Sequence, residues 1–139
     1  MIHFILGCCL VLVASAQEVP LADKAKITFE KTSHDFGDIF QGDVVTYAFK
    51  FTNTGKEPLI ISNVLVTCGC TAPSWPKEPI MPGKGGEIVI SFNSSGKMGV
   101  QNKVITVMSN AINSQAQLII KTNILPKPGD NLKNDPLNK

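Results

Sequence analysis

The sequence predicts an all-β protein folded as an antiparallel β-sandwich of about seven strands. The first observation behind this prediction is that apolar and polar residues alternate with period two from Ile27 onward, whereas no stretch shows a helical period of useful length. The second is that short clusters of Gly, Asn, Ser and Pro separate the alternating runs, as turns do between the strands of a sandwich.

Residues 44–52 form the clearest of the expected strands. Val45, Tyr47, Phe49 and Phe51 fall on one face, with smaller or polar residues on the other, which is the pattern of a half-buried strand. Similar runs are found at residues 59–66, 87–92, 103–108 and 117–124.

Three motifs predict specific features between or beside these strands. The Asn-Thr-Gly run at residues 53–55 is expected to supply a turn with positive φ. The Pro-Gly pair at residues 82–83 fits the two central positions of a type II turn. In the motif HDFGDI at residues 34–39, Gly37 and Asp38 resemble a bulge that would let an edge strand switch sheets.

The N-terminus predicts export. An uncharged apolar stretch at residues 4–13 is too short to cross a bilayer comfortably, and the Ala-Ser-Ala run at 14–16 follows it as a cleavage signal. We therefore expect residues 1–16 to be a signal peptide cleaved before Gln17, and the protein to reach the periplasm or the cell surface. The alternatives are an uncleaved membrane anchor or a lipid attached at Cys8, and only these would hold the protein at a membrane.

The remaining chain is expected to contain one domain. Residues 17–26 read as a linker, residues 27–125 as the sandwich domain, and the proline-rich, polar residues 126–139 as a flexible tail. The 13 basic residues are all lysines, spread along the chain, and the net charge is only +2. Since no arginine fork is available for phosphates or base edges, nucleic-acid binding is not expected.

Few side chains of the mature chain suit catalysis. Cleavage would remove two of the four cysteines and one of the two histidines, leaving His34 as the only histidine. Its neighbours Ser33 and Asp35 adjoin it in the sequence, which is not triad geometry by itself. The sequence therefore predicts a protein that is not an enzyme.

Cys68-Gly69-Cys70 is the main candidate for chemistry. Residues i and i+2 of a strand point the same way with Cα atoms ~6.5–7 Å apart, so a disulfide between Cys68 and Cys70 closes if the backbone bends at Gly69. So small a ring adds little stability and is more easily reduced than an ordinary structural bridge, which suits a redox role. Alternatively the thiols bind Cu(I) or Zn(II), for which His34 is a further candidate ligand, or they are structural or idle. No other cofactor is expected.

Trp75 lies in a segment with prolines at positions 73, 76, 79 and 82, which is expected to be a stiff loop or an edge segment. The indole could close one end of the sandwich. If it faced solvent instead, it would be a candidate anchor for a binding partner.

Several motifs resemble those of one family. They are residues 34–39 (HDFGDI), Gly42, 49–55 (FKFTNTG), 58–61 (PLII), 68–71 (CGCT), Pro73, Trp75, 79–80, 82–83, 86–88 and 107–110 (VMSN). In this order they resemble the secreted bacterial domain-of-unknown-function family DUF1573. The resemblance implies an immunoglobulin-like sandwich related to major sperm protein and Hydin-type domains, export, often as a lipoprotein, and no established activity.

Two functional hypotheses follow. The first is an exported, non-catalytic immunoglobulin-like module of the cell envelope that binds a protein or glycan partner through its edges and loops. The second is a periplasmic redox- or copper-handling protein that uses Cys68 and Cys70.

Overall fold

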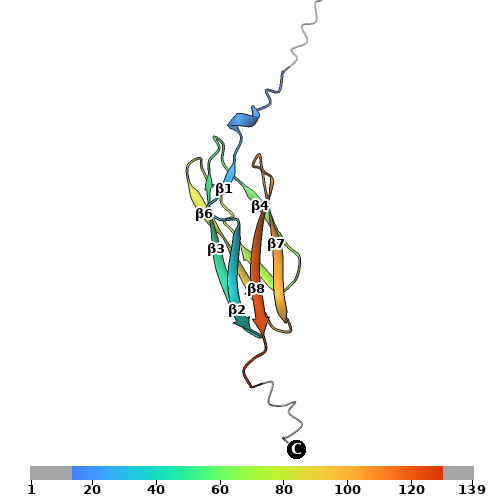
Figure 1. Cartoon of the computed structure of the whole chain (residues 1–139). Helices are drawn as coiled ribbons and strands as arrows, with labels where there is room; N and C mark the ends of the chain where they lie inside the picture. Colours follow the sequence, from blue (N-terminus) through green and yellow to red (C-terminus); the bar gives the residue numbers. More distant parts are fainter. Residues whose placement is uncertain (1–13, 130–139) are drawn as a thin grey trace, which may run out of the picture.

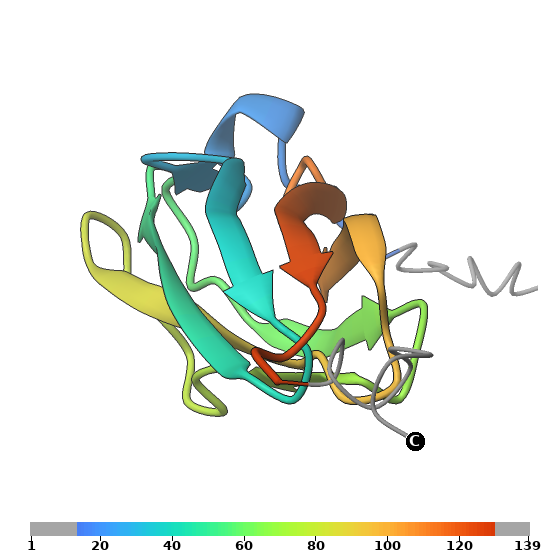
Figure 2. The same cartoon turned by 60° about the horizontal axis from the view of Figure 1, so that its bottom comes forward.

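The computed structural model describes residues 14–129 and consists of two four-stranded sheets packed face to face (Figures 1 and 2). The strands are β1 (Ile27–Phe29), β2 (Ser33–Phe40), β3 (Val44–Asn53), β4 (Ile61–Val66), β5 (Thr71–Ser74), β6 (Gly85–Asn93), β7 (Gly99–Ser109) and β8 (Gln115–Leu125). One sheet has the order β1-β3-β6-β5 and the other β2-β8-β7-β4. The predicted all-β sandwich is confirmed, with eight strand segments where about seven were expected.

The core lies between the sheets and is built by the alternating residues. In β3, Phe49 and Phe51 are 1% and 2% exposed, whereas Lys50 between them is exposed. Ile90 and Phe92 of β6 and Leu118 of β8 are fully buried in the same way. Removal of these apolar side chains from water is the main favourable term that holds the two sheets together.

The first strand of the sandwich is divided between the sheets. After β1, Glu30 N still donates to Lys50 O of β3 (3.0 Å), but Thr32 O already accepts from Ile119 N of β8 (2.9 Å). The chain therefore crosses from one sheet to the other at Lys31. This division explains why eight segments are found.

The predicted sheet switch at HDFGDI is thus in the wrong place, because residues 34–39 lie wholly within β2. The predicted bulge is confirmed: the register with β8 shifts between Asp35 and Asp38, and Gly37 has φ +70°. β2 runs parallel to β8, and it is the one parallel pair among the described strands. The expected antiparallel pairing holds for the other pairs.

Pro82 and Gly83 form the predicted type II turn. Gly83 has φ +78°, which this turn requires at its third position, and Lys84 N donates to Met81 O (3.0 Å).

The positive φ predicted for residues 53–55 is wrong. Gly55 is not among the described residues with positive φ. A Cβ at this position would instead lie 2.6 Å from Ala25 Cα and collide with the carbonyl oxygen of Lys24. Asn53 is fully buried and accepts a hydrogen bond from Gly55 N (3.0 Å). The motif is therefore a site of close backbone packing.

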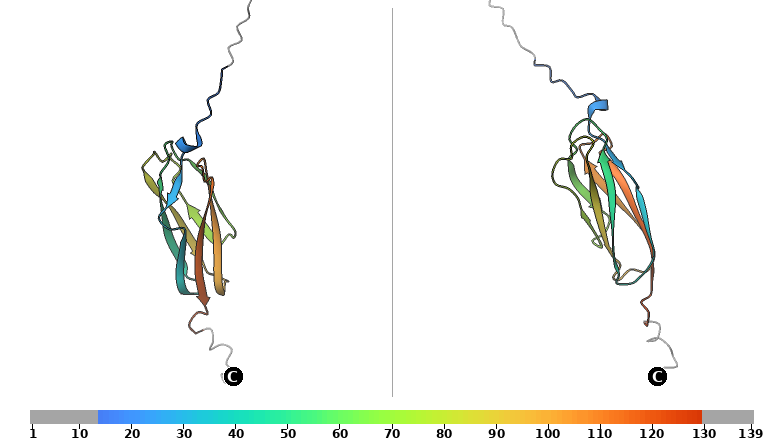
Figure 3. Two further views of the ribbon diagram at one scale, coloured as in Figure 1. Left: turned by 45° about the horizontal axis from the view of Figure 1, so that its top comes forward. Right: turned by 90° about the vertical axis from the view of Figure 1, so that its left-hand side faces the viewer.

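The segments flanking the sandwich leave from opposite ends (Figure 3). The expected linker at residues 17–26 contains a short 3₁₀ helix, Leu21–Asp23, and its last part is fastened to the domain: Ala25 is buried and its carbonyl accepts from Ile112 N (2.9 Å). Most of the expected signal peptide and most of the tail lie outside the described residues. No helix within residues 14–129 is long and apolar enough to cross a membrane.

Candidate functional site

The Cys68-Gly69-Cys70 turn connects the two sheets. It joins β4, the edge strand of one sheet, to β5, the edge strand of the other. Thr71 opens β5 opposite Phe92, close to the end of β6, whereas the chain enters β1 near the beginning of β6. The turn therefore lies at the end of the sandwich opposite to the segment that leads into β1.

A disulfide joins Cys68 and Cys70, whose Cα atoms are 5.3 Å apart. This separation is shorter than that of i and i+2 residues in an extended strand because residues 67–70 form a bend and a turn. The ring encloses only Gly69, so it restricts the unfolded chain little and adds about 1–2 kcal/mol of stability. Stability alone is therefore a poor explanation for the bridge.

The hydroxyl group of Thr71 lies beside both sulfur atoms. Thr71 Oγ1 is 3.7 Å from Cys68 Sγ and 3.9 Å from Cys70 Sγ, and the residue is 4% exposed. Because bridged sulfur atoms carry no proton, the hydroxyl is the donor in these weak contacts. Sequence reasoning did not identify this contact. The only signal was a threonine directly after the second cysteine.

His34 and the cysteines are not brought together. His34 lies on β2 and Cys68 follows β4, and these strands form opposite edges of the same sheet. Among residues 14–129, no three His, Cys, Asp or Glu side chains are grouped so that they could hold a metal ion. A metal could bind at the turn only after the bridge is reduced, and it would then have the Cys68 and Cys70 thiolates without His34, a donor set suited to Cu(I).

The His34 ring is part of an aromatic stack that joins β2 of one sheet to β3 of the other. It lies parallel to the Tyr47 ring at 3.7 Å between centroids and meets the Phe36 ring edge-on at 4.6 Å. Burial lowers the pKa of His34, Lys31 lowers it further, and Asp35 opposes the shift. The neutral imidazole is therefore favoured, and its arrangement is that of a packing residue.

Trp75 follows β5 and packs against the core, at the other end of that strand from the cysteines. Its Nε1 is buried without a hydrogen-bond partner, and the Lys77 ammonium lies 3.0 Å from the ring centroid. The indole is thus covered by the core on one side and by Lys77 on the other. This placement favours a role in closing the end of the sandwich.

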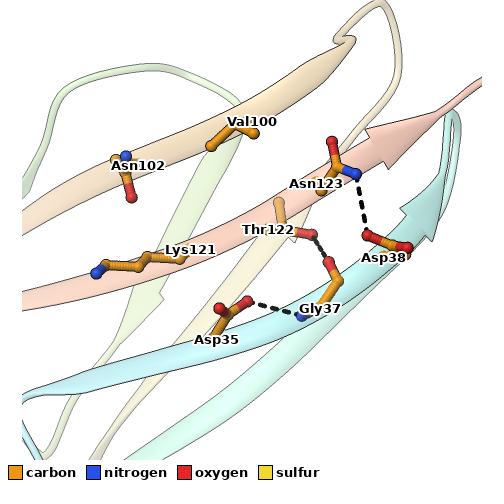
Figure 4. A pocket seen from close by; sticks show the side chains of 8 residues that line it. All are labelled: Asp35, Gly37, Asp38, Val100, Asn102, Lys121, Thr122 and Asn123. Atoms are coloured by element: carbon orange, nitrogen blue, oxygen red, sulfur yellow. Dashed lines mark hydrogen bonds between the residues drawn. The ribbon is translucent and has the colours of Figure 1, made fainter.

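A shallow hollow of about 380 Å³ lies over the bulge in β2 (Figure 4). Polar groups that line the hollow make hydrogen bonds that stabilise the bulge. Asp35 Oδ1 accepts from Gly37 N (2.8 Å), Thr122 Oγ1 donates to Gly37 O (2.8 Å), and Asn123 Nδ2 donates to Asp38 Oδ1 (3.0 Å). These contacts give the polar residues of HDFGDI a structural role. The sequence indicated the bulge but not its partners on β8.

Comparison with known proteins agrees with the motifs. A family model described as "Protein of unknown function (DUF1573)" matches residues 27–124, which confirms the resemblance. No protein with a curated description matches the chain.

Solved structures share the fold at low sequence identity. A protein of unknown function from Porphyromonas gingivalis W83 is similar with a TM-score of 0.65 and 17% identity, covering 76% of this chain and 49% of its own. The secreted serine protease VesC from Vibrio cholerae has a TM-score of 0.58 and 14% identity, with coverage of 78% and 25%. The PapD-like domain 7 of human CEP192 has a TM-score of 0.57 and 11% identity, with coverage of 88% and 99%. The chain thus spans half or less of the first two structures, and such distant similarity shows the fold alone.

Proposed function

The chain belongs to the family of proteins of unknown function DUF1573, and we propose that it is an exported, non-catalytic immunoglobulin-like module of the bacterial cell envelope that binds a protein partner. The similarity of the sandwich to a PapD-like domain and to a chaperone supports a binding or structural module. The observation that carries the proposal is the free edge of β4, which is open to an added strand.

The four sheet edges are not equally available. β1 has three residues, β5 has four and contains Pro73, and β2 is interrupted by the bulge at Gly37. β4 has six residues without proline. Its register with β7 shifts between Ile61 and Asn63, and from Asn63 to its end the pairing is regular. An edge strand presents backbone N–H and C=O groups on its outer side. Asn63–Val66 is the longest regularly paired stretch without proline at an edge in the described part of the chain, and within it Val64 N donates to Asn63 Oδ1 (2.9 Å).

The side chains beside this edge favour an extended polypeptide. Leu65 is 48% exposed on the outer face, opposite Thr106 of β7, and Val104 on the same face of β7 is also exposed. A strand added to β4 would gain backbone hydrogen bonds and place alternate side chains next to Leu65. A glycan lacks hydrogen-bond donors and acceptors at the regular spacing of a peptide backbone. We therefore propose that the partner of this edge is a protein segment.

Hydrogen exchange tests the β4 edge directly. The mature chain would be screened against a display library of random peptides, and the strongest binder synthesised as the probe. We expect the peptide to protect amides within Ile61–Val66, because an added strand supplies acceptors to them.

The variant Leu65→Lys tests the same edge by charge. It should weaken binding of the peptide about tenfold or more, because a lysine on an edge strand opposes strand addition. Val44→Lys is the matched control, since Val44 is an exposed apolar residue on the other sheet (59%). Protection confined to other strands, or equal loss of binding in both variants, would contradict the proposal. Binding of glycans on an array, with no protection at β4, would favour the glycan alternative.

Processing is a separate expectation. The apolar stretch and the Ala-Ser-Ala run at 14–16 support removal of residues 1–16, so exported protein should begin at Gln17. Mass spectrometry of the protein from the envelope or periplasmic fraction measures this end. A chain that keeps Met1 would contradict cleavage, and a diacylglyceryl group on Cys8 or Cys9 would replace it with lipidation.

A further inference from the structure

We infer that Cys68 and Cys70 are a reversible dithiol–disulfide couple that exchanges with a dithiol of another protein, and that Cys68 carries the sulfur attacked. This site is distinct from the β4 edge in its chemistry, because it needs a thiol partner and no added strand. It therefore goes beyond the proposed binding function and can succeed or fail without it.

The turn keeps its backbone contacts without help from the bridge. Thr71 N donates to Cys68 O (3.3 Å), and Asn93 N donates to Cys70 O (2.9 Å). Thr71 is buried and pairs with Phe92 at the start of β5. Since these contacts involve no sulfur, opening the bridge leaves the sheets connected as they are. The couple can therefore change its redox state within the folded domain.

The two sulfur atoms are placed differently. Both cysteines are half-buried, but Cys70 packs against the core and Cys68 does not. Apart from the two cysteines themselves, no atom lies within 4 Å of the position of a Cβ on Gly69, so no other segment packs over Gly69. A thiolate approaching from solvent therefore reaches Cys68 Sγ more easily than Cys70 Sγ.

A partner dithiol reduces the Cys68–Cys70 bridge in two exchange steps. One partner thiolate attacks Cys68 Sγ, an S–S bond forms between the two proteins, the Cys68–Cys70 bond breaks, and Cys70 leaves as a thiolate that takes up a proton. The second partner thiolate then attacks the partner sulfur of the mixed disulfide, and Cys68 leaves and takes up the other proton. The bridge is reduced by two electrons, and the partner dithiol is oxidised to a disulfide.

Thr71 is placed to assist this step. Its hydroxyl lies near both sulfur atoms and can donate to whichever becomes a thiolate. A hydrogen bond to the charged form favours that form, so the hydroxyl should lower the pKa of the thiols and make them better leaving groups. Thr71 acts through the cysteines and is a positioning residue.

Equilibration with glutathione tests whether the couple is reversible. The mature protein would be held in buffers with different ratios of reduced to oxidised glutathione, quenched with acid and analysed by intact mass. We expect the reduced fraction to follow the ratio and to return when the ratio is reversed, with an unchanged far-ultraviolet circular dichroism spectrum. A reference protein with long-range structural disulfides should stay oxidised throughout. A bridge that is oxidised in every buffer, or one whose reduction unfolds the domain, would overturn the inference.

Single substitutions test which sulfur reacts. In Cys70→Ser, the remaining Cys68 thiol should be alkylated by iodoacetamide about tenfold faster than the Cys70 thiol that remains in Cys68→Ser. Equal rates, or a faster Cys70, would overturn the assignment of Cys68. Thr71→Val, made in the Cys70→Ser background, keeps the shape but removes the hydroxyl, and it should move the alkylation midpoint to higher pH. An unchanged midpoint would remove Thr71 from the inference.

Discussion

Replacing Asn53 by alanine should lower the free energy of unfolding by about 3–5 kcal/mol. The side chain is fully buried and makes four hydrogen bonds to backbone groups. Its Oδ1 accepts from Lys26 N (3.3 Å) and Gly55 N (3.0 Å), and its Nδ2 donates to Glu57 O (2.7 Å) and Ile80 O (2.9 Å). Alanine would leave these groups without their partners. The bond to Ile80 O is buried and the other three are partly buried, and each such loss costs about 1–3 kcal/mol before the structure relaxes.

Urea denaturation measures this effect, with Asn123→Ala as the control. Asn123 makes one side-chain hydrogen bond, to Asp38, at the surface, so its replacement should cost less than about 1 kcal/mol. If Asn53→Ala differed from the parent by no more than the control does, the loop at residues 53–57 would have to be held by its backbone alone.

The role of Asn53 also shows where sequence reasoning stops. An Asn-x-Gly run between two apolar stretches is typical of a turn with positive φ, because both residues tolerate that conformation. What decides the position of Gly55 is the approach of the backbone at Lys24 and Ala25, thirty or more residues earlier in the chain. No local pattern contains that contact. The type II turn at Pro82-Gly83 was predictable because its cause lies within the turn itself.

Strands, too, could be predicted only where the local sequence contains their cause. Those with at least five alternating residues were found, since period two reports directly which face is buried. β1 has three residues and β5 has four with Pro73 among them, so neither offers a readable period. Both are defined by their partners, β3 and β6, and a pairing between distant segments leaves no local trace in the sequence.

For the candidate site, the sequence identified the cysteine pair but not its surroundings. The spacing of Cys68 and Cys70 predicts that they can meet, because only Gly69 separates them. It could not show that His34 lies at the opposite edge of the sheet, since that depends on the strand order β2-β8-β7-β4. Nor could it show that the turn passes from one sheet to the other, or that Cys70 packs against the core while Cys68 does not.

Replacing Trp75 by alanine should lower the free energy of unfolding by about 2–4 kcal/mol, because the indole is packed against the core and its loss leaves a cavity at the end of the sandwich. Trp75→Phe should cost less than about 1.5 kcal/mol, since it keeps a ring under Lys77 and removes an Nε1–H that is buried without a partner.

Unfolding must be followed by far-ultraviolet circular dichroism, because Trp75 is the only tryptophan of the chain. Lys77→Ala serves as the control and should cost under about 1 kcal/mol, as expected for an exposed cation–π contact. If Trp75→Ala were as stable as the parent but no longer bound the selected peptide, the indole would be a partner anchor and not a plug.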